Sequence, residues 1–396
     1  MNSKKYGEFE RVLNFFSSKK ILLFGNFEIT RHIVKFLAIN DIKIEGYVVK
    51  SYFDKILLES HYDYKFDFPI FPLDEIDSLH GYKIASHSEG CYSDLLNELK
   101  LKGVDEVLLI NDEICNAFYR KFQPRNRNSF ILEIDVVDHC NLGCNNCFHF
   151  SQIAEPTFMD PESFRKDMKR MSDLSGGLVH KMYLLGGEPL LHPNFDAIIK
   201  IAREHFPQTF IQIITNGILL LSAENAVYGN LYEICKEYNI CISITEYPVK
   251  LDIDKIKKKS REYGVSFFNK LEHEKYIPTH NNEKLMEKST LDLTRSQNPS
   301  LSALNCYFAG NCFTLKDGKL ATCPVILNIQ HFNKAFNTSL EITKEDYIDI
   351  HRASNFFELA EFMARPAAFC SYCDFRNRRW EKWKPSSKLI DEYIEI

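Results

Sequence analysis

Residues 136–150 read VVDHCNLGCNNCFHF, and this stretch carries the strongest evidence for the fold. It places Cys140, Cys144 and Cys147 in a C-x3-C-x2-C spacing. A structural zinc site usually closes its tetrahedron with four protein ligands, and disulfides would leave one of three thiols unpaired. A four-iron cluster held by three thiolates has one iron without a protein ligand, and that iron can bind a small molecule. We therefore expect a [4Fe-4S] cluster with an open iron, with a structural metal site as the alternative.

The composition is that of a globular, soluble protein. The 396 residues are many for one core and suggest two or three domains. The longest apolar runs are shorter than a bilayer span and the N-terminus shows no secretory signal, so we expect a cytoplasmic protein with no membrane partner. A net charge of -5 gives no general case for nucleic acid. Twelve cysteines in a reducing compartment point to metal or catalysis before disulfides.

Strand and helix patterns alternate in two regions of the chain. In the first, strand patterns at KKILLFG, IKIEGYVV, YKIASHS and DEVLLIN predict a small parallel α/β domain. The polar segment 123–129 predicts a linker. From 130 to about 270, five strand–helix cycles, one with a helix from Ala223 to Glu237, predict a partial parallel barrel. Residues 271–300 are polar and irregular, which predicts a long loop over a site.

Glycine-rich and polar motifs end the next strands of the predicted barrel. The stretch MYLLGGEPLLHP ends its strand with Gly186, Gly187, Glu188 and Pro189. Ligands of parallel α/β folds bind outside the carboxyl ends of the strands, where glycines let the backbone approach closely. The following two strands end in Thr215-Asn216-Gly217 and in ISITEYP, which contains Ser243 and Tyr247. An ordinary turn and an ordinary strand serine are the alternatives for Thr215-Asn216 and Ser243.

These motifs together resemble the radical S-adenosylmethionine (radical SAM) superfamily, whose C-x3-C-x2-C loop follows the first barrel strand. The resemblance implies that S-adenosylmethionine chelates the open iron and that one electron cleaves its sulfonium to a 5'-deoxyadenosyl radical. Gly186, Gly187, Glu188 and Pro189 match the family's glycine-rich motif, which implies contacts to the methionyl ammonium. The resemblance also suggests cofactor contacts for Thr215 and Asn216 and a ribose contact for Ser243. Many members carry an aromatic residue before the third cysteine, where this chain has Asn146.

The C-terminal region contains a second set of cysteines. Cys306 and Cys323 flank LKDGKLAT, which predicts a tight Asp-Gly hairpin, and Cys370 and Cys373 form C-x2-C. Four thiolates can close a full coordination shell. The pattern resembles the short "twitch" form of the SPASM domain, which implies one auxiliary [4Fe-4S] cluster, and a zinc ribbon is the alternative. Of the remaining cysteines, Cys312 is most simply inert, and four are expected in the core: Cys91, Cys115, Cys235 and Cys241.

The resemblance therefore implies an α/β fold with three parts. These are a Rossmann-like domain at 1–124, a partial (β/α)6 radical SAM barrel at 130–300, and a twitch/SPASM-like iron–sulfur domain at 301–396. The first domain has only Gly25 in its FGNFEIT turn, so a dinucleotide site is not indicated. The basic and aromatic tail at 376–384 predicts a charged terminal surface before an RNA-binding one.

The C-terminal spacing resembles that of twitch-bearing members of the superfamily that dehydrogenate aminocyclitols. By that analogy, we expect a radical enzyme that abstracts hydrogen from a sugar, nucleotide-sugar or cyclitol, with a flavodoxin- or ferredoxin-type electron donor. His149 and Tyr247 are the candidates for proton transfer, because oxidation of a carbinol also removes a proton. A SPASM-type peptide maturase and a non-enzymatic iron–sulfur sensor or scaffold are the alternatives.

Overall fold

A computed structural model describes most of the chain. The residues that it describes are 3–17, 20–25, 33–34, 37, 42–51, 54–56, 68–87, 93–111, 114, 130–269, 279–280 and 283–395. The chain divides into two compact units, Met1–Gln123 and Pro124–Ile396. The predicted linker, Cys91 and Cys115 lie outside the described residues.

The first unit is a parallel α/β domain, as the strand patterns predict. Its five strands lie in the order β3-β2-β1-β4-β5, and every pair is parallel. This is the order of the first five strands in a classical dinucleotide-binding sheet. Leu22, Val48 and Ile84 form the centre of its core. The described elements are α1 (Ser3–Phe16), β1 (Ile21–Phe24), β2 (Gly46–Val49), β3 (Ile70–Pro72), η1 (Leu73–Glu75), β4 (Lys83–His87), α4 (Ser93–Leu101) and β5 (Glu106–Ile110).

The second unit is built on an eight-stranded sheet in the order β10-β9-β8-β7-β6-β13-β14-β15. The first six strands of this order run parallel, and β14 and β15 continue antiparallel. The predicted α/β fold with a parallel sheet is therefore confirmed. The strands are β6 (Ile131–Val137), β7 (Lys181–Gly186), β8 (Phe210–Thr215), β9 (Cys241–Ile244), β10 (Phe267–Asn269), β13 (Cys312–Lys316), β14 (Lys319–Ala321) and β15 (Tyr347–Asp349).

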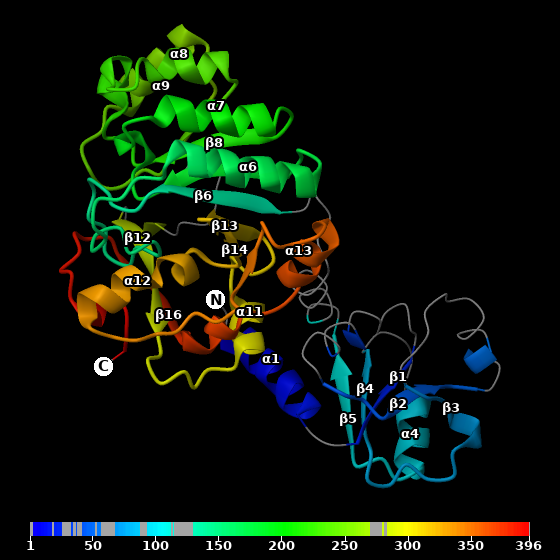
Figure 1. The fold of residues 1–396 in the computed structure, drawn as a ribbon. Coiled ribbons are helices and arrows are strands. Elements are labelled where there is room, and N and C mark those ends of the chain that lie inside the picture. The colour runs from blue at the N-terminus through cyan, green and yellow to red at the C-terminus, as the bar shows by residue number, and fades with distance from the viewer. Residues whose placement is uncertain are drawn as a thin grey trace. The chain divides into compact units, whose positions relative to one another are not determined.

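Helices cover one face of this sheet (Figure 1). Alternate strand residues such as Leu132, Leu184 and Ile213 pack with Phe164 and Ile198 of the helices in one core, and all are at most 1% exposed. In the part of the chain that the structure describes, the helices of the second unit are α6 (Pro161–Ser175), η2 (Pro189–Leu191), α7 (Phe195–His205), η3 (Leu220–Asn225), α8 (Leu231–Glu237), α9 (Ile253–Tyr263), α11 (Pro299–Asn305), α12 (Pro324–Phe336), α13 (Phe356–Met363), η4 (Ala368–Tyr372) and η5 (Ile390–Glu392). Of these, α12 and η4 belong to a second core instead.

The predicted helix from Ala223 to Glu237 is wrong in its first half. The chain forms η3 there, turns at Gly229 with φ of 105°, and begins α8 after Asn230, whose side chain accepts from the Tyr232 amide. The apolar spacing alone predicts one continuous helix. Gly229, with its positive φ, and Asn230, which caps α8, divide it into two.

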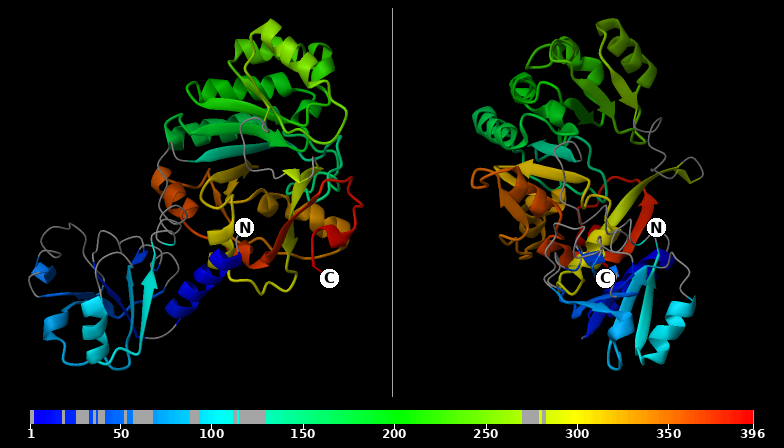
Figure 2. Two further views of the ribbon diagram at one scale, coloured as in Figure 1. Left: turned by 180° about the vertical axis from the view of Figure 1, so that it is seen from behind. Right: turned by 90° about the vertical axis from the view of Figure 1, so that its right-hand side faces the viewer.

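The described part of residues 271–300 is not the irregular loop that its polarity predicts. The described part contains β12 (Glu283–Leu291), which pairs antiparallel with β16 (Cys373–Lys382) and with β11 (Thr279–His280). Figure 2 shows the long yellow β12 beside the red β16. A half-exposed strand carries many polar residues, so composition alone does not separate it from a loop.

The LKDGKLAT hairpin is confirmed, with Asp317 and Gly318 both at positive φ between β13 and β14. The hairpin also extends the barrel sheet, because β13 pairs in parallel with β6.

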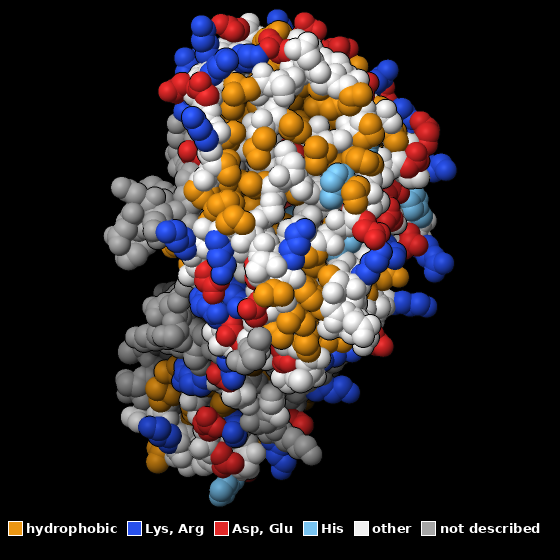
Figure 3. All heavy atoms as spheres, turned by 90° about the vertical axis from the view of Figure 1, so that its left-hand side faces the viewer, with side chains coloured by type: hydrophobic (Ala, Val, Ile, Leu, Met, Phe, Trp, Pro, Cys, Tyr) orange, Lys and Arg blue, Asp and Glu red, His pale blue; other side chains and the backbone are white. Residues whose placement is uncertain are grey.

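On the face of the molecule in Figure 3, hydrophobic side chains gather in the upper part and charged side chains of both signs are interspersed around them. Among the described residues, no helix has the length and apolarity needed to cross a bilayer.

Candidate functional site: two groups of cysteines

The cysteine loop, residues 140–147, follows β6 directly. The Leu142 amide donates to the sulfur of Cys140 at 3.3 Å, so the backbone already turns around this thiol. Asn146 has a φ of 56°, a left-handed conformation that asparagine adopts more readily than an aromatic residue does. This local geometry accounts for asparagine at the position before the third cysteine.

Gly186 and Gly187 lie against the backbone that leads into the cysteine loop. A Cβ on Gly186 would come within 2.4 Å of the Val137 carbonyl, and one on Gly187 within 1.9 Å of the His139 carbonyl. The Gly187 amide donates to Val137 at 2.6 Å. Only glycine fits such close backbone contact, so the end of β7 and the cysteine loop are locked together.

Glu188 connects the glycine motif to the end of β8. Its carboxylate accepts from the Thr215 hydroxyl at 2.7 Å and from the Asn216 amide at 2.9 Å, and it is 1% exposed. Burial raises the pKa of Glu188 to about 7, against the opposing effect of these hydrogen bonds. The Asn216 side chain in turn reaches the Cys140 sulfur at 3.6 Å. The motifs at 186–189 and 215–216 thus form one polar network beside the cysteine loop.

The end of β9 supplies the aromatic side of the site. Ser243 is 2% exposed within β9, and Tyr247 follows the strand. Burial raises the pKa of Tyr247 well above its ordinary value, and the sulfurs of Cys144, Cys147 and Cys140 add to this effect. The Tyr247 hydroxyl therefore stays protonated. The structure places Tyr247 beside the thiols themselves.

His149 lies in a buried polar network just after the cysteine loop. Its Nδ1 is 3.2 Å from the Asp135 carboxylate, which also accepts from the Asn328 side chain at 2.6 Å. Lys316 donates to Asn328 at 2.8 Å. Burial alone would lower the pKa of His149, but the Asp135 carboxylate outweighs it and raises this pKa to about 9. At neutral pH the imidazole is held as a cation, able to donate a hydrogen bond.

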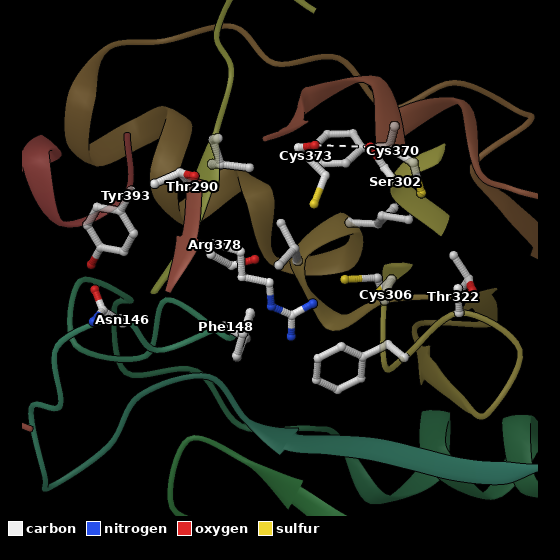
Figure 4. Close-up of a pocket in the computed structure, with 18 of the residues that line it drawn as sticks. Asn146, Phe148, Thr290, Ser302, Cys306, Thr322, Cys370, Cys373, Arg378 and Tyr393 are labelled. Carbon is white, nitrogen blue, oxygen red and sulfur yellow. Dashed lines mark hydrogen bonds between the residues drawn. The ribbon is translucent and has the colours of Figure 1, made fainter. Parts of the chain in front are cut away.

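The second group of thiols lines a pocket that also contains Cys147 and Phe148 (Figure 4). Its members are Cys306, Cys323, Cys370 and Cys373. The Ser302 hydroxyl donates to the Cys373 carbonyl at 3.1 Å, which ties α11 to the C-x2-C turn. Burial raises the pKa of Cys373 to about 12, and the neighbouring Cys306 adds to this effect.

Arg378 reaches into the same pocket from β16 (Figure 4). Its guanidinium pairs with Glu287 of β12 and stacks over Phe375, with 5.2 Å between the guanidinium carbon and the ring centroid. Burial would lower the pKa of Arg378, but Glu287 and the nearby Cys306 and Cys373 sulfurs raise it overall. A permanent positive charge therefore lies beside two of the four thiols.

Both groups have the donors that an iron–sulfur cluster needs. Burial raises the pKa values of Cys140 and Cys144 to about 12, and neighbouring sulfurs raise them further. Buried thiolates that repel one another are stabilised by a cation between them, which a cluster supplies. The described residues contain no group of three or more His, Cys, Asp or Glu arranged for a single metal ion.

Several residues at the site were not assigned to it by the sequence motifs. Asn328, Lys316, Arg378 and Trp383 come from strands and helices far along the chain from the cysteine loop. The tail 376–384 was the one sequence signal among them, and its interpretation as a charged terminal surface is incomplete because Arg378 is buried in the pocket.

The site belongs to a known class of domain. Residues 134–245 match the family model described as the radical SAM superfamily, so this part of the chain is a radical SAM domain. The superfamily is one of enzymes, and the domain uses a [4Fe-4S] cluster and S-adenosylmethionine.

Two curated proteins are similar to this domain. One is the S-adenosylmethionine-dependent nucleotide dehydratase of Selenomonas ruminantium, 32% identical over 96 residues, which are 24% of this chain and 32% of the relative. The other is the GTP 3',8-cyclase of Chlorobaculum tepidum, 34% identical over 89 residues, 22% of this chain and 26% of the relative. The chain thus spans about a third or less of the length of these relatives.

Two solved structures are distantly similar. The structure of BtrN in complex with AdoMet and 2-DOIA is 18% identical, covers 68% of this chain and 98% of its own, and has a TM-score of 0.39. That of Streptococcus suis SuiB bound to precursor peptide SuiA is 12% identical, covers 78% of this chain and 77% of its own, and has a TM-score of 0.31.

Proposed function

We propose that this chain is a radical enzyme that abstracts hydrogen from a sugar, nucleotide-sugar or cyclitol and oxidises, epimerises or deoxygenates it. Cys140, Cys144 and Cys147 would hold the [4Fe-4S] cluster. When bound, the cluster and S-adenosylmethionine supply a 5'-deoxyadenosyl radical. The backbone of Gly186 and Gly187 and the carboxylate of Glu188 would bind the methionyl group, with Ser243 on the ribose.

The observation that carries the substrate class is the polar face of the parallel sheet. Strand residues alternate, and those next to Leu132, Ile213 and Ile242 in sequence lie on the face away from the helices. That face presents buried polar side chains from four strands: Glu133, Asp135, Gln212, Ser243 and Thr314. Polar side chains of this kind can hydrogen-bond the hydroxyls of a polyol, which offer both donors and acceptors.

His149 is placed to act on such a substrate. Its imidazole lies beside Asp135 of the polar face and two residues after Cys147. Held as a cation, it would donate a hydrogen bond to a substrate oxygen and orient the carbinol that loses hydrogen. Tyr247, which lies beside the thiols of the cysteine loop, would shape the cofactor side of the site.

The second group of thiols would hold the auxiliary [4Fe-4S] cluster. Cys306, Cys323, Cys370 and Cys373 line the pocket that Cys147 and Phe148 also border, so the two clusters would be neighbours. A cluster there would accept the electron that a substrate radical loses on oxidation, and the carbinol proton would pass to a carboxylate of the polar face, Glu133 or Asp135. Both curated relatives are named for nucleotide substrates, and nucleotides carry a ribose, which falls within the proposed class.

An anaerobic assay with deuterated sugars, nucleotide-sugars and cyclitols tests the proposal. The reconstituted protein is reduced, supplied with S-adenosylmethionine, and 5'-deoxyadenosine is analysed by mass spectrometry. Deuterium transferred from one carbinol position supports the proposal and identifies the hydrogen removed. Transfer only from a short precursor peptide would establish a peptide maturase instead. Absence of 5'-deoxyadenosine from a sample with a full iron content would point to a sensor or scaffold.

A further inference from the structure

The C-terminal segment of the chain forms a strap, residues 382–386, along the cysteine loop. The Asn145 amide donates to the Lys384 carbonyl at 3.0 Å, and the Ser386 amide donates to the Gly143 carbonyl at 2.9 Å. The Asn145 side chain accepts from the Lys384 amide at 3.0 Å. Cys144 and Pro385 face each other in an antiparallel bridge. Figure 1 shows the red C-terminal segment beside the teal loops after β6.

Trp383 lies in the middle of this strap and faces Cys144. Its indole Nε1 is buried and has no hydrogen-bond partner among the described atoms, sulfur included. A buried indole N–H normally finds an acceptor. Trp383 lies close enough to the Cys144 thiol to oppose the rise in its pKa due to burial, although no hydrogen bond joins the two here.

The aromatic rings of Trp383 and Tyr247 lie beside the Cys144 thiol. Tyr247 approaches Trp383 from the end of β9, with 6.4 Å between ring centroids and 43° between planes. A thiol accepts hydrogen bonds weakly, whereas a metal-bound thiolate accepts them well. The indole N–H of Trp383 therefore gains a good acceptor when Cys144 is a cluster ligand. Hydrogen bonds to cluster sulfurs and exclusion of solvent both set the reduction potential of such a cluster.

We infer that Trp383 is a positioning residue of the radical SAM cluster: its N–H would donate to the Cys144 sulfur once Cys144 is a cluster ligand, and the strap that carries it covers this edge of the cysteine loop. The donated hydrogen bond stabilises the reduced, more negative cluster and makes its reduction potential less negative. This inference rests on the proposed role of Cys140, Cys144 and Cys147 as cluster ligands.

The two tryptophans of the chain provide a matched test. Trp383→Phe removes the N–H and keeps an aromatic ring, whereas Trp380→Phe makes the same change at a 39% exposed position on β16. The measurement is an anaerobic redox titration followed by electron paramagnetic resonance, using the signal that changes on addition of S-adenosylmethionine. Only a cluster with an open iron responds in this way. We expect a more negative midpoint in Trp383→Phe and no shift in Trp380→Phe. An unchanged midpoint in Trp383→Phe overturns the inference.

A second measurement tests the strap without any cluster. In the iron-free chain, alkylation of each thiol by iodoacetamide is followed by mass spectrometry. Trp383→Ala should raise the rate at Cys144 several-fold, and Trp380→Ala should leave it unchanged. Equal rates in the two variants would contradict the covering role. A wild-type protein that binds no S-adenosylmethionine-responsive cluster would instead refute the proposed function, and the alkylation result would still stand.

Discussion

The two groups of cysteines differ in how the chain brings their thiols together. The three thiols of the cysteine loop come from eight consecutive residues, and the glycine motif at 186–187 lies against the backbone that leads into the loop. The four thiols of the second group come from three separate segments and surround a pocket that Arg378 enters. Three local ligands leave a coordination position for a small molecule, while four distant ligands close it. Reaction at an open iron and storage of an electron thus call for different numbers of ligands.

The largest expected effect comes from breaking the first group. Cys144→Ala should abolish both the S-adenosylmethionine-responsive cluster and 5'-deoxyadenosine formation, because the cluster loses one of only three ligands. Iron analysis and chromatography of the nucleoside products measure this. Cys235→Ala is the control, since Cys235 is 1% exposed in the core of α8 and should leave both unchanged. Full cofactor cleavage by Cys144→Ala would remove this loop from the mechanism.

Breaking the second group should separate cofactor cleavage from substrate turnover. Cys370→Ala is expected to lose about half of the iron, one cluster of two, and all substrate oxidation. It should still form 5'-deoxyadenosine without substrate, because the cysteine loop is intact. Cys312→Ala is the matched control, since Cys312 is buried in β13 next to Ile131 of β6. Loss of iron from Cys312→Ala would show that Cys312 is a ligand.

A smaller effect is expected at the polar network after the cysteine loop. His149→Gln should lower substrate turnover about a hundredfold, because the cation that orients the substrate oxygen is lost. Cluster content and uncoupled 5'-deoxyadenosine formation should remain. His351→Gln changes another Asp–His pair, with Asp167, on a 43% exposed side chain and serves as control. Equal turnover in the two variants would assign His149 to packing alone.

Glu188 tests how S-adenosylmethionine is bound at the cysteine loop. Glu188→Gln should weaken S-adenosylmethionine binding about tenfold, through loss of a charge-assisted hydrogen bond to the ammonium. Because burial raises the pKa of Glu188 to about 7, wild-type binding should tighten as the pH rises through 7 and the carboxylate ionises. The variant should show no such dependence. Calorimetric titrations at pH 6 and pH 8 compare the two proteins, with the exposed Glu155→Gln as control.

Glu188 should also make the stability of the fold depend on pH. A carboxyl group whose pKa is raised by folding contributes stability below its unfolded value of 4.5 and loses it as the pH rises toward 7. The thermal midpoint of the cofactor-free protein should therefore fall between pH 5 and pH 8 by a few degrees more than that of Glu188→Gln. An equal fall of the thermal midpoint in the two proteins between these pH values would contradict this.

Local patterns in the sequence predicted the parallel sheet well. The short apolar runs predicted each barrel strand from β6 to β10, because buried parallel strands are rich in hydrophobic residues. The prediction failed at β12, where a polar, partly exposed strand resembles a loop, and at α8, where Gly229 and Asn230 interrupt a helical pattern.

The sequence by itself determined the chemistry of the cysteine loop, because spacing within eight residues fixes which thiols can share one cluster. Only the tertiary structure decided what surrounds it. Lys384 bonds to Asn145 across 239 positions, and Asn328 reaches Asp135 across 193. Contacts over such separations depend on how sheets and helices pack, so the strap, Trp383 and Arg378 leave no periodic pattern in the chain.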